Sequence, residues 1–171
     1  VLIAADWAGM SDEDTAPLLL TMSERPSEAF RFLDRVHQGM ANFLALGFAV
    51  RGTLAELEAL HVDGQLVYDP QQLYFYGISQ GHILGGTFVA LSPHIERAVL
   101  GSGGCTFSFM MFRSWHFNSF LLIISQLLPD PLDQQKFVAL CQSSFDRIDP
   151  VTYAPYVLAD TLPGSPARRR L

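Results

Sequence analysis

Short, mostly apolar runs of strand length alternate with longer helical segments in the first hundred residues of the chain. The short runs are residues 1–5, 73–76 and 97–100, and continuous apolar runs of this kind are typical of strands buried on both faces of a sheet. Residues 30–44 repeat apolar side chains at three- and four-residue spacing, which predicts an amphipathic helix, and residues 80–91 are also predicted to be helical. The order strand, helix, strand, helix, strand predicts an α/β fold with a parallel sheet and right-handed crossovers.

The rest of the chain is predicted to form loops and helices. Residues 11–14 are predicted to be an acidic loop, and residues 53–60 a further helical stretch. Residues 107–157 have helix-like patterning and turn signals, so we interpret this segment as an inserted helical cap. We therefore predict a core domain at 1–104, a helical cap at 105–160, and a lead-in to the next core strand at 161–171.

The composition is unusually apolar. Of the 171 residues, 49% are hydrophobic and 16% are charged, whereas a typical globular chain has about 25% charged residues. The deficit indicates a surface that is covered by another part of the protein or by a partner, and a homo-oligomer is one such arrangement. Because the first residue already lies in an apolar run and the last ones lead toward a strand, we expect the chain to be an incomplete part of a larger fold.

Charge and hydropathy narrow the range of partners. The net charge is -6, and the only basic cluster is at residues 168–170, so a nucleic-acid partner is not expected. The longest apolar run, residues 117–128, is interrupted by polar side chains. A membrane span needs about 20 apolar residues, so no membrane span is expected.

Cysteine usage and loop composition give no sign of a cofactor or a metal. Cys105 and Cys141 are too few for a disulfide framework and have no zinc-ligand spacing. The cysteines therefore do not indicate in which redox compartment the protein works. We expect Cys105 to be a buried, inert thiol, although it follows a loop that could face a ligand. That loop, residues 101–104, is glycine-rich but lacks the lysine of a phosphate-binding loop.

The strongest chemical signal is the segment GISQG at residues 77–81. A strand before it and a helix after it would place Ser79 on a sharp turn, with its hydroxyl exposed and its φ positive. The glycines would give room between strand and helix, and the backbone N–H of Gln80 would face an oxyanion. The alternative is a glycine-flanked serine turn without chemistry.

In this context the chain resembles the α/β-hydrolase superfamily, and within it the bacterial esterase/lipase-like proteins with a G-[IV]-S-Q-G turn. A second similarity is the turn D-x-x-G-x-S formed by Asp6, Gly9 and Ser11, in which Asp6 would cap the turn. The resemblance covers most of residues 1–104. It implies a hydrolase-type parallel sheet with flanking helices and a cap, and a serine hydrolase that cleaves carboxylic esters. Ser79 would be the nucleophile and Gln80 a backbone oxyanion donor.

The resemblance also implies a histidine and an acid that follow the serine along the chain. None of the aspartates after Ser79 follows a buried strand, and we interpret Asp130, Asp149 and Asp160 as turn or cap residues. We therefore expect the triad acid, the histidine and one oxyanion donor to lie outside this chain. The in-chain alternatives for the base are His116, in the predicted cap, and His82, three residues after the serine.

Two classes of function remain open. The first is the ester hydrolase, with a small-molecule ester as substrate; the aromatic residues of the cap would suit an apolar acyl group, or they fill the cap's own core. The second is a non-catalytic α/β-hydrolase-like binding or scaffold module in which Ser79 is only a turn residue. A third arrangement completes the triad from another chain or with His116.

Overall fold

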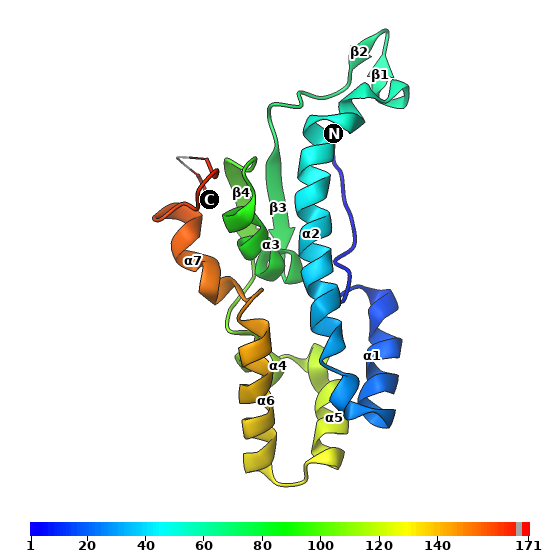
Figure 1. The fold of residues 1–171 in the computed structure, drawn as a ribbon, viewed down its shortest axis with the longest axis vertical. Coiled ribbons are helices and arrows are strands. Elements are labelled where there is room, and N and C mark those ends of the chain that lie inside the picture. Colours follow the sequence, from blue (N-terminus) through cyan, green and yellow to red (C-terminus); the bar gives the residue numbers. More distant parts are fainter. Residues whose placement is uncertain (167–168) are drawn as a thin grey trace. The chain divides into compact units, whose positions relative to one another are not determined.

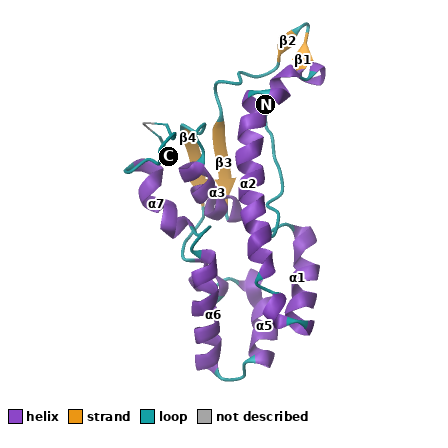
Figure 2. Ribbon diagram, in the orientation of Figure 1, coloured by secondary structure: helices purple, strands orange, loops and turns teal. Residues whose placement is uncertain are grey.

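The computed structural model describes residues 1–166 and 169–171 and is a mixed α/β structure in which helices predominate (Figures 1 and 2). Its α-helices are α1 (Asp12–Glu24), α2 (Arg31–Arg51), α3 (Gln80–Leu91), α4 (Phe107–Met111), α5 (Asn118–Leu127), α6 (Pro131–Phe145) and α7 (Pro150–Leu158). Short 3-10 helices are η1 (Pro26–Glu28), η2 (Thr53–Glu56), η3 (Glu58–Leu60) and η4 (Trp115–Phe117). The strands are β1 (His61–Val62), β2 (Gln65–Leu66), β3 (Tyr74–Ile78) and β4 (Arg97–Gly101).

The chain divides into two compact units. One contains residues 1–5, 40–103 and 153–171, and the other contains residues 6–39 and 104–152. Helix α2 contributes residues to both units, which are described separately below. The division into domains at 1–104, 105–160 and 161–171 stays a prediction.

The first unit is built around a parallel strand pair, β3 and β4, joined through α3. The predicted strands at 73–76 and 97–100 and the predicted helix at 80–91 are thus confirmed. Helix α3 packs on one face of the pair, where the Phe75 ring lies 5.1 Å from that of Phe88. On the far side of β4, Arg170 forms a parallel bridge with Arg97, and the Ala98 amide donates to the Arg170 carbonyl at 2.9 Å.

The opposite face of this strand pair is apolar and exposed. Strand alternation places Tyr74, Tyr76 and Ile78 of β3 on that face, and the register puts Val99 of β4 beside Tyr76. Tyr76 is 64% exposed and Val99 is 58% exposed. The expectation of an uncovered apolar surface is therefore confirmed for this face of the sheet.

The strand predicted at residues 1–5 is wrong. These residues form no regular structure, and Leu2 is 87% exposed. Apolar composition predicts burial, but a strand also needs a neighbour with which to exchange backbone hydrogen bonds. Among the described residues, β3 and β4 pair only with each other and with Arg170, so the sheet is smaller than predicted.

Residues 53–66 also differ from the prediction. The helical stretch expected at 53–60 is two short 3-10 helices, and a small antiparallel hairpin of β1 and β2 follows. Asp63 and Gly64 make its two-residue turn with φ of 51° and 75°, the sign that a type I′ turn requires at both positions.

In the basic cluster at 168–170, the two described arginines differ, because Arg170 is exposed and Arg169 is not; Arg168 lies outside the described residues. Arg169 is buried and donates to the carbonyls of Ala90, Ser92, Ile95 and Tyr156 at 2.8–3.2 Å. Burial lowers the pKa of Arg169. This guanidinium therefore ties the C-terminal segment to the end of α3, where unpaired helix carbonyls favour a cation.

The second unit is helical, and the helix-like patterning at 107–157 is confirmed by α4 to α7. Met22 of α1, Ala29 and Ile124 of α5 form a core cluster. Buried Asp149 accepts hydrogen bonds from the amides of Phe107 and Val151 at 2.6 and 2.9 Å. It thereby satisfies the first turns of both α4 and α7, consistent with its predicted role as a cap residue.

The acidic loop predicted at 11–14 is wrong, because α1 begins at Asp12. Ser11 is the N-cap and forms a capping box with Asp14. The Asp14 carboxylate also accepts from the Gly9 amide at 2.7 Å and from Arg35 Nε at 2.7 Å. The hydrogen bonds that hold the turn at residues 9–11 therefore come from Asp14, not from Asp6 as predicted.

Candidate functional site

Ser79 lies at the turn between β3 and α3 and is the N-cap of that helix. Its φ is 54° and its ψ is −117°, so the predicted positive φ is confirmed. Its amide donates to the Gly101 carbonyl at 3.0 Å, and its carbonyl accepts from the His82 amide at 2.9 Å. A non-glycine residue in this region costs about 1–3 kcal/mol, and such strain clusters at functional sites. The side chain is exposed at the carboxyl end of the strand pair.

The two glycines of the motif have different roles. A Cβ on Gly77 would lie 2.2 Å from the carbonyl oxygen of Gly81, so only glycine fits there without a backbone shift. A Cβ on Gly81 would meet nothing within 4 Å. The expectation that both glycines give room is therefore right for Gly77 and wrong for Gly81. The clearance that α3 needs further along comes at Gly85, where a Cβ would lie 2.3 Å from the Phe75 ring.

Gln80 is the first residue of α3. The first amides of a helix have no acceptor within the helix itself, and the helix dipole makes this end attractive to negative charge. The position suits an oxyanion donor, and that role of Gln80 stays a prediction.

The loop after β4 carries a second strained serine that the sequence analysis did not single out. Ser102 has a φ of 53° and is exposed, next to the residue whose carbonyl binds the Ser79 amide. The neighbouring Gly103 approaches the imidazole of His82 so closely that a Cβ there would lie 2.1 Å from His82 Cγ. The sequence signal was present in the run GSGG, because glycines on both sides of a serine indicate an unusual backbone.

The described histidines include no base in contact with Ser79. His82 lies under the glycine-rich loop, and its Nδ1 is buried with no hydrogen-bond partner among the described residues. His116 belongs to the second unit, where its ring lies 4.5 Å from that of Trp115. His61 Nδ1 is 2.9 Å from the Leu57 carbonyl.

Two other histidines have perturbed pKa values. For His94, burial and then the charge of Arg51 lower the pKa. Burial, followed by the charge of Arg147, also lowers the pKa of His37, which is half-buried.

The two cysteines differ. Burial raises the pKa of Cys141 to about 11, which makes it an inert thiol. Cys105 follows the strand-end loop and is exposed, so its predicted burial is wrong.

Within residues 1–166 and 169–171, no group of three or more histidine, cysteine or acidic side chains could hold a metal ion. No helix in that part of the chain combines the length and apolar character needed to cross a bilayer. Comparison of the chain with protein-family models, curated proteins and solved structures gives no significant match.

Proposed function

We propose that this chain carries the nucleophile of a serine hydrolase that cleaves carboxylic esters through an acyl-enzyme on Ser79. The observation that carries the proposal is the backbone of Ser79, strained at φ 54° between a parallel strand and a helix, with its side chain exposed at the strand's carboxyl end. A turn of this type presents a serine hydroxyl to solvent and aligns the next amide beside it.

The proposed reaction has two steps. Ser79 Oγ attacks the ester carbonyl carbon while its proton passes to a base, and the Gln80 amide donates to the carbonyl oxygen as it gains charge. The bond to the alcohol oxygen then breaks, and the alcohol leaves with the proton. Water then adds to the acyl carbon while its proton passes to the base. The bond to Ser79 Oγ breaks, Ser79 Oγ takes that proton, and the carboxylic acid is released.

The base and the acid that orients it are proposed to come from outside these 171 residues. The reason is local: His82, the histidine nearest to Ser79 in sequence, has its ring packed against Gly103. Its side chain starts on α3, in a direction that does not favour proton transfer from the turn serine.

The arrangement of strands supports a hydrolase-type fold as the larger context. The order β3, β4 and Arg170 is parallel throughout, with α3 packed on one face and a helical segment inserted between β4 and Arg170. Helix α3, which links β3 to β4, also matches the preference of such sheets for helical crossovers.

The test is covalent labelling of the protein, expressed from its complete gene, with a fluorophosphonate probe and with p-nitrophenyl butyrate as substrate. We expect Ser79→Ala to abolish both labelling and turnover. Ser102→Ala is the matched control, because it removes a second exposed, positive-φ serine from the adjacent loop; we expect it to keep labelling. Unchanged turnover in Ser79→Ala would refute the mechanism.

Histidine variants locate the base. If it lies outside the 171 residues, His82→Ala and His116→Ala keep Ser79 labelling, whereas loss of labelling in one of them, with the fold intact, identifies an in-chain base.

The exposed face formed by Tyr74, Tyr76, Ile78 and Val99 favours a second candidate, a non-catalytic binding or scaffold module. Large exposed apolar faces commonly mark interaction surfaces. The same labelling experiment separates the two candidates, because a module has no activated serine.

A further inference from the structure

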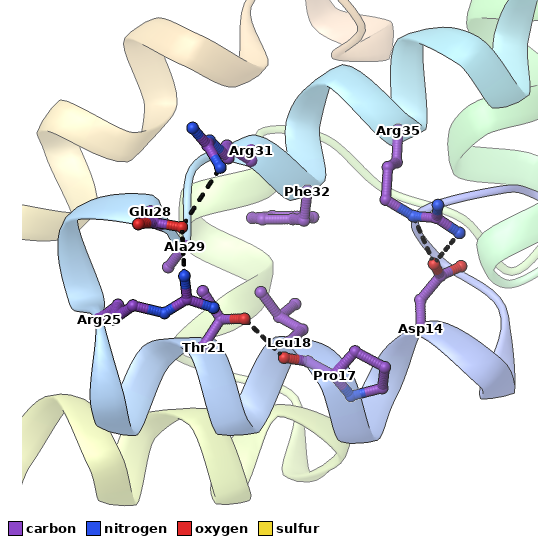
Figure 3. Close-up of a pocket in the computed structure, with 10 residues that line it drawn as sticks. All are labelled: Asp14, Pro17, Leu18, Thr21, Arg25, Glu28, Ala29, Arg31, Phe32 and Arg35. Carbon is purple, nitrogen blue, oxygen red and sulfur yellow. Dashed lines mark hydrogen bonds and ion pairs between the residues drawn. The ribbon is translucent and has the colours of Figure 1, made fainter.

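A groove in the second unit combines arginines with an apolar lining (Figure 3). It has a volume of about 310 Å³ and lies along α1, η1 and the start of α2. We propose that this groove binds a small organic carboxylate with an apolar chain. The proposal uses only residues of this unit and does not depend on the chemistry proposed for Ser79.

The middle of the groove is apolar. Leu18 of α1, Ala29 and Phe32 line it, and Figure 3 shows the Phe32 ring between the two charged ends. Thr21 adds no free hydroxyl donor there, because its Oγ1 donates to the Pro17 carbonyl at 2.8 Å. An apolar chain of a ligand would therefore gain by burial here and lose no hydrogen bond to water.

One end of the groove carries excess positive charge. Arg25 and Arg31 both contact a single oxygen of Glu28, at 3.1 and 3.3 Å. Two guanidinium groups thus share one carboxylate, and each has five N–H donors of which the recorded contact uses one. Arg25 and Arg31 are 61% and 78% exposed in their side chains, and ion pairs at such exposure contribute about 0–1 kcal/mol. A ligand carboxylate can join or replace Glu28 at little cost and gain charge-assisted hydrogen bonds.

At the other end of the groove, the charged side chains already neutralise each other. Arg35 is paired with Asp14, whose carboxylate also accepts from the Gly9 amide and the Ser11 hydroxyl. Burial alone would raise the pKa of Asp14, but these hydrogen bonds outweigh it and lower the pKa. The carboxylate of a ligand therefore belongs at the Arg25 and Arg31 end, with its chain running over Phe32 toward the Asp14 end.

The test is a titration of the protein, expressed from its complete gene, with octanoate, followed by methyl NMR shifts of Leu18, Thr21 and Ala29. 1-Octanol serves as the ligand without charge, and acetate as the ligand without a chain. We expect saturable octanoate binding that shifts these methyl signals, and at least tenfold weaker binding of both comparison ligands. Equal affinity for 1-octanol, or octanoate shifts only elsewhere in the protein, would overturn the proposal.

Variants test the arginine end directly. We expect the double variant Arg25→Gln, Arg31→Gln to bind octanoate at least tenfold more weakly. The control Arg113→Gln removes an exposed arginine of the same unit that does not line the groove, and we expect it to bind as the unchanged protein does. Equal losses in both would show a nonspecific charge effect and refute the site. If the double variant loses its helical circular dichroism, the three-ligand comparison on the unchanged protein decides the question.

Discussion

At the scale of single residues, the site around Ser79 depends on close backbone approaches that side chains would prevent. Gly77 approaches the Gly81 carbonyl, and Gly103 approaches the His82 ring. Ser79 and Ser102 both hold a positive φ at the carboxyl end of the strand pair. Backbone strain of this kind persists only where surrounding contacts hold the backbone in place, and the close approaches at the glycines provide such contacts.

The two glycines of the motif give a matched pair of substitutions. We expect Gly77→Ala to lower the free energy of unfolding by about 3 kcal/mol, because its Cβ would overlap backbone that cannot move independently. We expect Gly81→Ala to be neutral or to stabilise the protein by about 0.5–1 kcal/mol, since its site is open and alanine favours a helix. Urea unfolding measures both. Similar losses in the two variants would contradict the geometry described for this turn.

At the scale of elements, α1 is held by one buried carboxylate. Asp14 joins the capping box of Ser11, the turn at Gly9 and the guanidinium of Arg35 on α2. These contacts connect two helices and the loop that precedes the first of them. Because the start of α1 depends on Asp14, we expect substitution of Asp14 to destabilise the protein and substitution of its neighbours to have little effect.

We expect Asp14→Ala to lower the free energy of unfolding by about 2–3 kcal/mol, because it leaves buried amides and a guanidinium without their acceptor. Asp12→Ala is the control: Asp12 is exposed in the same first turn and contributes about 0.5 kcal/mol through the helix dipole.

The pH dependence of stability in acid is a second measure of the Asp14 contacts. The pKa of Asp14 is lowered in the folded state, so its contribution is complete above its ordinary pKa of 3.8 and is lost as the pH falls below that value. Asp14→Ala should therefore unfold with a weaker pH dependence in this acidic range. A pH profile equal to that of Asp12→Ala would contradict this assignment.

At the scale of the whole molecule, two half-buried histidines make stability depend on pH near neutrality. His94 lies edge-to-face on Phe48, with ring centroids 4.5 Å apart, and its Nε2 is buried without a partner among the described residues. The pKa values of His94 and His37 are both lowered in the fold. Below the ordinary pKa of 6.5, the unfolded chain therefore binds protons that the folded chain does not.

We expect thermal stability to fall as the pH is lowered from 7 to 5.5, and the double variant His37→Gln, His94→Gln to lose less over the same interval. His116→Gln replaces an exposed histidine and should keep the full dependence. Thermal unfolding at several pH values measures this. A double variant with the same dependence as the unchanged protein would show that other groups cause it.

Several elements of the fold could be predicted because their signals are local. Residues 80–91 form a helix with the predicted bounds, and the amphipathic repeat at 30–44 lies in α2 except for its first residue. The turn at Ser79 was predicted for the same reason, since a strand, two glycines and a helix occur in immediate succession. The error at 11–14 was also local: Ser11 followed by Asp14 is a helix start, and Pro17 inside α1 obscured the helix that follows.

The sequence by itself determined several of the elements and the strained serine turn, because periodicity, glycine placement and capping act between residues close in the chain. Only the tertiary structure decided which other segments of the chain each element contacts. Residues 1–5 are apolar enough for a strand but have no strand beside them among the described residues, Cys105 is exposed where burial was expected, and Arg169 is buried although it is charged. The tertiary structure also decided the groove beside Arg25 and Arg31, because α1 and the start of α2 form it together. The type of a residue indicates how favourable it is to remove its side chain from water. Whether that side chain is buried or paired depends on which distant segments the fold places next to it.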